Sequence, residues 1–260
     1  RNINCGRIGF RRLALKQENG EFALLINDTA IFCRGACWTV NDMLSLTGSM
    51  QDLTQTLTLA RDAGMNMLRI AGTMIYEQDA FYTLCDALGI LVWQDFMFAN
   101  MDYPHDDASF ISSVQAEATQ QLSRWRSHPC MAIYCGGSEI EQQAAMLGMA
   151  KENWRNPLFA QVLPTLCKQW HPDVPYIAAS PMGEGLPFHL NSGVSHYYGV
   201  GAYLRPVSEV RRAGVRFASE CLGMANIPEQ ATLNLLADGA ITVCHHPRWK
   251  QRTPRDAGAG

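Results

Sequence analysis

The stretch CMAIYCGGSEIE, residues 130–141, decides the fold that the sequence predicts. An apolar run of strand length comes first, two glycines follow, and Glu139 stands where the run gives way to helical spacing. A strand that is apolar on both faces is typical of a parallel sheet covered by helices. Gly136 and Gly137 would let the chain leave the strand tightly and bring backbone close to a substrate, so that Glu139 projects from the strand's carboxyl end.

The same alternation of short apolar strands and helical segments continues on both sides of this stretch. Residues 52–64 predict a helix with Ser49 and Asp52 as a capping box, and residues 77–89 and 110–125 carry apolar side chains at helical spacing. Seven candidate strands follow residue 30, within 31–38, 65–72, 90–96, 130–137, 175–180, 194–199 and 215–220. An open doubly wound sheet and a (β/α)8 barrel both fit that count.

The first 28 residues have a different rhythm. Short apolar groups alternate with turns, and ENGE at 18–21 is a hairpin signal between two strand-like runs. We therefore predict that residues 1–28 are the last strands of a small β domain and that residues 29–260 form the α/β domain.

Polar residues at strand ends favour the barrel. Five of them stand at the carboxyl ends of predicted strands, where a barrel assembles its active site: Arg69, Asp95, Glu139, His196 and Glu220. The first strands carry no glycine-rich phosphate turn, which weakens the open-sheet alternative. The prediction is a (β/α)8, TIM-type barrel.

Glu139 and Glu220 end the fourth and seventh strands of that count, which face each other in a closed barrel. Two carboxylates on opposite sides of a glycosidic bond divide the work: one, with a raised pKa, protonates the leaving oxygen, and the other attacks the anomeric carbon. Taken singly, each glutamate has an alternative role as a helix N-cap or an ion-pair partner.

Further side chains suggest supporting roles. Arg69 could hold an ionised nucleophile and keep its pKa low, or form a structural ion pair with Asp95. Aromatic side chains near the strand ends could form a platform for a sugar ring, or belong to the core. These are Trp38, Trp93, Tyr197 and Tyr198.

Other chemistries fit less well. His196 and the Cys244–His246 run invite a metal site, but adjacent histidines chelate poorly and no HExxH pattern occurs. Ser138 in GGSE lacks the second glycine of a nucleophile elbow. We predict neither a metal nor an organic cofactor.

Composition excludes several classes of partner. The net charge of −3 offers no broad basic field for nucleic acid or anionic lipid. No apolar stretch approaches the roughly 18–20 residues that span a bilayer. The nine cysteines are an odd number without a CxxC pair, which indicates free thiols and favours a reducing, cytoplasmic compartment.

At these residues the chain resembles glycoside hydrolase family 2, specifically its β-mannosidase branch. The matching stretches are FCRGACW, AGMNMLRIAG, IYEQDAFYTLCDALGILVWQDFMFA, SHPCMAIYCGGSEIE, SHYYGVGAYLRP and RFASE. The resemblance implies a retaining hydrolase of β-linked sugars with Glu139 as acid/base and Glu220 as nucleophile. It implies supporting or substrate-binding roles for Arg69, Trp38, Asp95, Ser138, His196 and Tyr198.

The chain also departs from the family. Ser138 stands where relatives carry an asparagine that contacts the sugar 2-hydroxyl, and Cys37, Ala71 and Cys221 replace the usual asparagine, tryptophan and aromatic residue. A β-galactoside or β-glucuronide therefore remains an alternative substrate.

The resemblance further implies a jelly-roll domain and most of an immunoglobulin-like sandwich before this chain, and a closing eighth strand after it. The chain ends before any plausible eighth strand. A truncated barrel without activity, or a carbohydrate-binding remnant, is the corresponding alternative.

Overall fold

The computed structural model describes residues 8–222, 229–236 and 247. The chain divides into two compact units. The first comprises Arg1–His196 and Val215–Ser219, and the second comprises Tyr197–Gly214 and Glu220–Gly260. Each unit is described by itself below.

A five-stranded parallel sheet forms the centre of the first unit. Its strands lie in sequence order: β4 (Gly35–Cys37), β5 (Met67–Ile70), β6 (Leu91–Asp95), β7 (Met131–Cys135) and β8 (Tyr176–Ile177). Helices connect them: α1 (Met50–Asp62), α2 (Asp79–Leu88), α3 (Ala108–Trp125), α4 (Ile140–Met146) and α5 (Leu163–Trp170). The short turns η2 (Lys151–Asn153) and η3 (Leu158–Val162) lie between α4 and α5. The predicted alternation of strands and helices is confirmed over this region.

The last two predicted strands pair with each other. β9 (Val194–Tyr197) and β10 (Phe217–Cys221) form a separate two-stranded sheet. Among the described residues, seven strands follow residue 32, which matches the predicted number, with β7 fourth and β10 seventh. Within the described ranges the strands form no closed ring, so barrel closure stays a prediction. The end of the chain, before which no eighth strand is predicted, lies outside the described residues. Two described elements lie wholly in the second unit: η4 (Val207–Glu209) and α6 (Gln230–Leu236).

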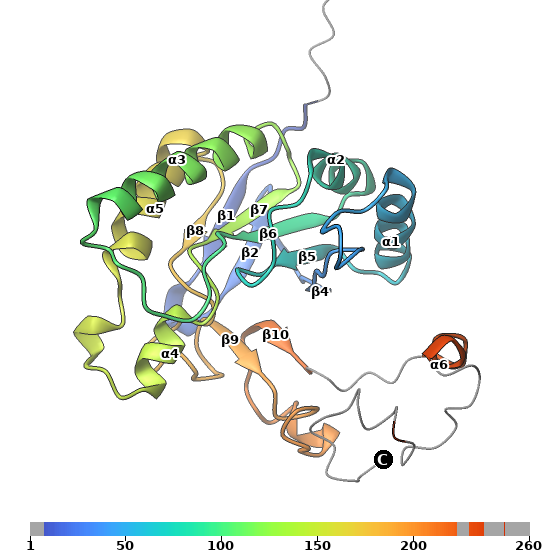
Figure 1. The fold of residues 1–260 in the computed structure, drawn as a ribbon. Coiled ribbons are helices and arrows are strands. Elements are labelled where there is room, and N and C mark those ends of the chain that lie inside the picture. The colour runs from blue at the N-terminus through green and yellow to red at the C-terminus, as the bar shows by residue number, and fades with distance from the viewer. Residues whose placement is uncertain (1–7, 223–228, 237–246, 248–260) are drawn as a thin grey trace, which may run out of the picture. The chain divides into compact units, whose positions relative to one another are not determined.

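Side-chain alternation along the strands separates two cores. Leu68 and Ile70 of β5 pack toward the helices α1, α2, α3 and α5, whereas Met67 packs on the opposite face. Figure 1 shows these helices along one side of the sheet and the strands β1 and β2 on the other. Because side chains alternate with a period of two, Arg69 lies on the face of Met67, away from the helices.

An antiparallel sheet covers that second face. The predicted hairpin is present: β1 (Leu13–Lys16) pairs with β2 (Ala23–Ile26) across the turn η1 (Glu18–Gly20). The sheet continues through a tight turn into β3 (Thr29–Ile31), across the predicted boundary at residue 28. Phe22 and Leu24 pack against Trp93 and other residues of the parallel sheet. The immunoglobulin-like parent domain and the domain boundary both stay predictions.

Two further expectations can be compared with the structure. The seven described cysteines, all except Cys5 and Cys244, are free thiols, as predicted. Among the described helices, none combines the length and the apolar character that crossing a membrane requires.

The capping box of α1 is confirmed and gives a first testable prediction. Ser49 Oγ accepts a hydrogen bond from Asp52 N, and the Asp52 carboxylate accepts one from Ser49 N. Ser49→Ala is expected to lower the free energy of unfolding by about 1 kcal/mol, because a backbone donor loses its partner. Urea unfolding checks this value. Ser45→Ala, which removes an exposed hydroxyl from the preceding loop, is the control, and equal effects of the two changes would contradict the prediction.

Candidate active site

The two glycines after β7 are required by neighbouring backbone. A Cβ atom on Gly136 would lie 2.3 Å from the carbonyl oxygen of Ala178, and one on Gly137 would lie 2.7 Å from that of Phe98. Both separations are far shorter than van der Waals contact. The two glycines therefore allow a close approach to the adjacent chain segments, and a close approach to a substrate stays a prediction.

Glu139 leaves the strand in an unusual backbone conformation. It occupies the N-cap position of α4 with φ 59° and ψ 18°, in the left-handed region, and its side chain makes no capping hydrogen bond. Glu139 thus occupies the N-cap position that one alternative predicted, but its side chain does not cap the helix. A non-glycine residue in this region costs about 1–3 kcal/mol and persists only where its surroundings hold it, which is common at functional sites.

Hydrogen bonds from the adjacent chain segments hold this backbone. Glu139 N donates to Ser180 O at 2.7 Å, and Ser138 N donates to Phe98 O at 2.9 Å. Ser180 N in turn donates to Gly137 O at 3.0 Å. The segments that follow β6, β7 and β8 are therefore tied together just beyond the ends of the strands.

The Glu139 side chain is held by His196. His196 Nδ1 lies 2.8 Å from Glu139 Oε1, and the side chains are 1% and 23% exposed respectively. Gln143 Nε2 lies farther from the second carboxylate oxygen, at 3.3 Å. The hydrogen bond from His196 lowers the pKa of Glu139 and outweighs partial burial, which raises it. This is opposite to the raised pKa expected of a proton donor, and it favours the carboxylate.

Arg69 and Asp95 form a buried ion pair, as one alternative predicted. Arg69 Nη2 donates to Asp95 Oδ2 at 2.7 Å, and the side chains are 4% and 0% exposed. Asp95 also accepts hydrogen bonds from Trp93 Nε1 at 2.8 Å and Gly72 N at 3.1 Å. Every part of this carboxylate therefore has a polar partner, which a buried charge requires.

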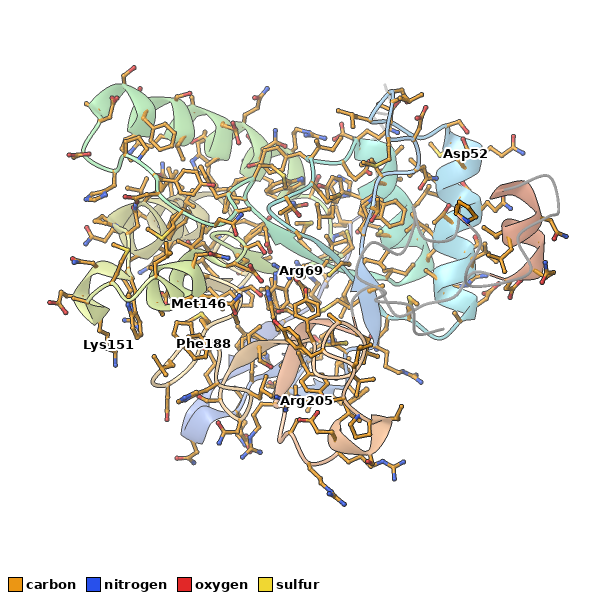
Figure 2. All side chains as sticks on the ribbon, turned by 60° about the horizontal axis from the view of Figure 1, so that its bottom comes forward. Asp52, Arg69, Met146, Lys151, Phe188 and Arg205 are labelled. Carbon is orange, nitrogen blue, oxygen red and sulfur yellow. The ribbon has the colours of Figure 1, made fainter. Side chains whose placement is uncertain are left out.

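Arg69 extends from this ion pair to the residues around Glu139. Its Nη2 lies 3.3 Å from Ser138 Oγ and its Nη1 lies 3.4 Å from His196 Nε2. Figure 2 shows Arg69 inside the mass of side chains, whereas Asp52 lies at its edge. Four strands, β5, β6, β7 and β9, thus bring together five of the predicted site residues: Arg69, Asp95, Ser138, Glu139 and His196.

The two tryptophans lie in the cores. Trp38 is 5% exposed, packs against Phe81 and donates from Nε1 to Glu77 Oε1 at 2.8 Å. Trp93 is 1% exposed and stacks on Phe217. Both rings therefore have the core position that was the alternative to a sugar platform. The buried carboxylate of Glu77 was not foreseen.

The second unit contains the other predicted carboxylate. Tyr198 OH donates a hydrogen bond to Glu220 Oε2, and Tyr197 OH donates one to Glu209 Oε2. Glu209 also pairs with Arg205 at 2.9 Å. Tyr198 is thus a partner of the predicted nucleophile within this unit.

Sequence reasoning missed Ser180. It is fully buried, and its Oγ lies 3.2 Å from His196 Nε2 and 2.6 Å from Ser219 Oγ. A signal was available, because Ser180 ends the predicted strand PYIAAS and so occupies the same kind of position as the predicted site residues.

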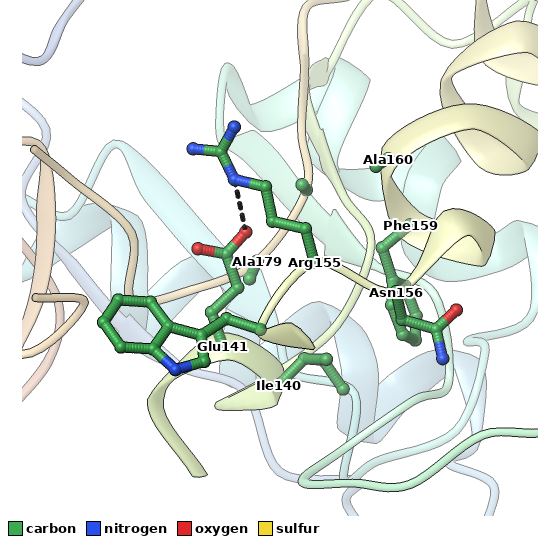
Figure 3. A pocket seen from close by; sticks show the side chains of 9 residues that line it. Ile140, Glu141, Arg155, Asn156, Phe159, Ala160 and Ala179 are labelled. Atoms are coloured by element: carbon green, nitrogen blue, oxygen red, sulfur yellow. Dashed lines mark ion pairs between the residues drawn. The ribbon is translucent and has the colours of Figure 1, made fainter. Parts of the chain in front are cut away.

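A crevice lies beside the helix that begins after Glu139. Ile140, Glu141, Trp154, Arg155 and Phe159 contribute to its walls, and Arg155 Nε lies 3.7 Å from Glu141 Oε1 (Figure 3). The crevice has no room for a water molecule, so a sugar ring would not fit in this arrangement.

One cluster in the first unit has the residue types of a metal site. Asp86, His128 and Cys130 have ligand atoms within 4.8 Å of one another. The Asp86 oxygens already accept hydrogen bonds from Cys130 N, at 2.8 Å, and contact His128 Nδ1 at 2.6 Å. Burial raises the pKa of the Cys130 thiol far above its usual value, so the thiolate that metals bind is disfavoured. The Cys244–His246 run lies outside the described residues.

Comparison with known proteins identifies relatives. No family model matches the chain. β-Mannosidase B of Thermothelomyces thermophilus is 33% identical over 250 residues, which cover 88% of this chain and 29% of that protein. The β-mannosidase of Capra hircus is 36% identical over 217 residues, covering 74% of this chain and 24% of that protein.

Solved structures of β-mannosidases and β-glucuronidases are also similar to this chain. The β-D-mannosidase of Dictyoglomus thermophilum superimposes with a TM-score of 0.81 at 32% identity, covering 95% of this chain and 32% of that one. The β-glucuronidase of Parabacteroides merdae, at 16% identity and a TM-score of 0.61, shares the fold. The chain belongs to glycoside hydrolase family 2. Within that family it is β-mannosidase-like, and it spans about a quarter to a third of the length of the relatives that it matches.

Proposed function

We propose that the protein hydrolyses terminal β-mannosides with retention of configuration, with Glu139 as acid/base and Glu220 as nucleophile. One observation carries the proposal: Glu139 stands at a strand end in a strained, partly exposed position, held by His196 beside a buried Arg69–Asp95 pair. The names of the relatives supply the reaction class and the sugar.

The proposed reaction has two displacements. In the first, the Glu220 carboxylate attacks the anomeric carbon while Glu139 gives its proton to the departing glycosidic oxygen. In the second, Glu139, now a carboxylate, takes a proton from water as the water displaces Glu220. The lowered pKa of Glu139 keeps the carboxylate ionised before it acts as the base of the second step, and it opposes the proton donation of the first step.

The partners of the two glutamates fit these roles. Tyr198 donates to Glu220 Oε2, which would orient the carboxylate of Glu220 and favour its ionised form. Arg69 is fixed by Asp95, and its positive charge would favour ionised carboxylates nearby.

The test is the substitution Glu220→Ala. Where this chain is encoded as part of a longer protein, the whole of that protein is expressed. Hydrolysis of an aryl β-mannoside should fall to the background rate, because no covalent intermediate can form. Azide should then restore turnover by attacking from the vacated side, and the product should be the α-mannosyl azide. Unchanged hydrolysis by Glu220→Ala would refute the assignment, and Glu209→Ala, which removes another carboxylate of the same unit, is the matched control.

The sugar requires a separate measurement. Ser138, which replaces the family's asparagine, is 3% exposed and its hydroxyl accepts from Arg69. A panel of aryl β-mannoside, β-galactoside and β-glucuronide compares the candidates directly. We expect the highest kcat/KM for the mannoside, and a preference for either other sugar would replace mannose while leaving the two glutamates in their roles.

A further inference from the structure

Ser180 contacts the proposed acid/base by two routes. Through its backbone, Ser180 O accepts from Glu139 N at 2.7 Å and helps to hold the left-handed conformation of Glu139. Through its side chain, Ser180 Oγ lies 3.2 Å from His196 Nε2, and the other nitrogen of that ring lies 2.8 Å from Glu139 Oε1. A single fully buried residue therefore fixes both the backbone and the side-chain partner of Glu139.

The neighbours of His196 define which ring nitrogen carries the proton. Arg69 Nη1 lies 3.4 Å from Nε2, and a guanidinium has only donors. We infer that Nε2 presents its lone pair to this donor, which in the neutral ring places the proton on Nδ1. Nδ1–H then donates to Glu139 Oε1, which accepts it as a carboxylate.

Ser180 and Ser219 complete a chain of donors with one direction. With Nε2 as an acceptor, Ser180 Oγ–H donates to it and its oxygen accepts from Ser219 Oγ, at 2.6 Å. The order is Ser219 to Ser180 to His196 to Glu139. Hydrogen bonds aligned in this way strengthen one another, and Ser180 stands at the centre of the chain.

We propose that Ser180 is a positioning residue for the acid/base, holding the His196 ring so that Nδ1–H occupies Glu139 Oε1 and leaves Oε2 to exchange the proton with the leaving group or water. This rests on the proposed function of Glu139. Ser180 itself touches no reacting atom in this scheme, and its effect on the reaction passes through His196 and the Glu139 backbone.

The kinetic test uses leaving groups of different quality with Ser180→Ala. The value of kcat/KM reports the first displacement, in which a poor leaving group such as phenol needs a proton and 2,4-dinitrophenol does not. We expect kcat/KM for the phenyl β-mannoside to fall about 10- to 100-fold, the cost typical of a small misplacement. The value for the dinitrophenyl β-mannoside should change little, whereas a purely structural role would lower both equally.

Three variants serve as controls. Ser195→Ala removes another fully buried serine hydroxyl, which donates to Phe217 O at 3.3 Å, and should leave the leaving-group dependence unchanged. Ser180→Thr keeps the hydroxyl and should show the wild-type dependence on leaving group. Ser219→Ala removes the next donor of the chain and should act in the same direction as Ser180→Ala, with a smaller effect, even if Ser180→Ala does not fold.

An NMR measurement separates this inference from the proposed function. In protein labelled with ¹⁵N-histidine, with the His196 signals assigned from His196→Gln, Nε2 should give the shift of a hydrogen-bonded, unprotonated nitrogen. Ser180→Ala should move that shift toward the value of an unbonded nitrogen. An unmoved shift, or equal losses with both leaving groups, overturns the positioning role, whereas an inactive wild-type protein with the expected shifts overturns only the proposed reaction.

Discussion

Glu139→Gln is expected to lower kcat/KM for a phenyl β-mannoside by about 10²–10⁴-fold, the usual contribution of general acid catalysis. The amide keeps the shape of the side chain but has no proton to give to the leaving oxygen. The dinitrophenyl β-mannoside should lose far less in kcat/KM. Azide should accelerate turnover of this substrate and give the β-mannosyl azide, because it attacks the covalent intermediate without needing a base.

The matched control for this change lies two residues further along. Glu141→Gln alters a carboxylate of the same helix that is 7% exposed, whose pKa is raised by burial and whose ion-pair partner is Arg155. It should retain the wild-type dependence on leaving group. If Glu139→Gln hydrolysed both aryl mannosides at the wild-type rate, the acid/base role would pass to another residue.

Asp95→Ala is expected to lower the free energy of unfolding by about 3–5 kcal/mol. The change removes the Asp95 carboxylate from the guanidinium of Arg69, which is 4% exposed, and it also removes the acceptor of Trp93 Nε1 and Gly72 N. The lost hydration of the buried charge is then no longer offset by this ion pair. Urea unfolding followed by tryptophan fluorescence measures the loss.

An exposed ion pair of the same length provides the comparison. Arg61 Nη2 and Asp62 Oδ1 are also 2.7 Å apart, but their side chains are 45% and 59% exposed. Asp62→Ala should therefore cost about 0–1 kcal/mol, since solvent screens such a pair. Equal losses for Asp62→Ala and Asp95→Ala would show that burial is not what makes the Arg69–Asp95 pair important.

The sequence predicted the helices and strands well, because apolar spacing, helix caps and turn residues act within a few positions of the chain. The helix 50–62 follows from the apolar spacing and the capping box of Ser49, and the helix ending at Leu88 follows from the glycine after it, which adopts φ +73°. The strand ends at Arg69, Asp95 and Glu139 were located by the same reasoning. Residues at the carboxyl ends of adjacent parallel strands meet at one edge of the sheet, so their proximity was also predictable.

The direction of the Glu139 pKa was not predictable in this way. The expectation of a raised pKa came from the general chemistry of the acid, whereas the observed lowering comes from His196, 57 positions away in the chain. The contacts of Gly136 and Gly137 with the carbonyls of Ala178 and Phe98 were not predictable either, because residues 136 and 137 do not reveal which segments lie beside them. Such contacts depend on which strands become neighbours and in what register.

The sequence by itself determined the order of the elements, the polar residues at the strand ends and the relationship to β-mannosidases, because periodicity, caps and turn residues act within a few positions. Only the tertiary structure decided that Arg69 pairs with Asp95, that Trp38 lies in the core and that Ser180 holds His196. Each of these is a contact between distant segments, and its geometry is set by strand register and packing rather than by local preference.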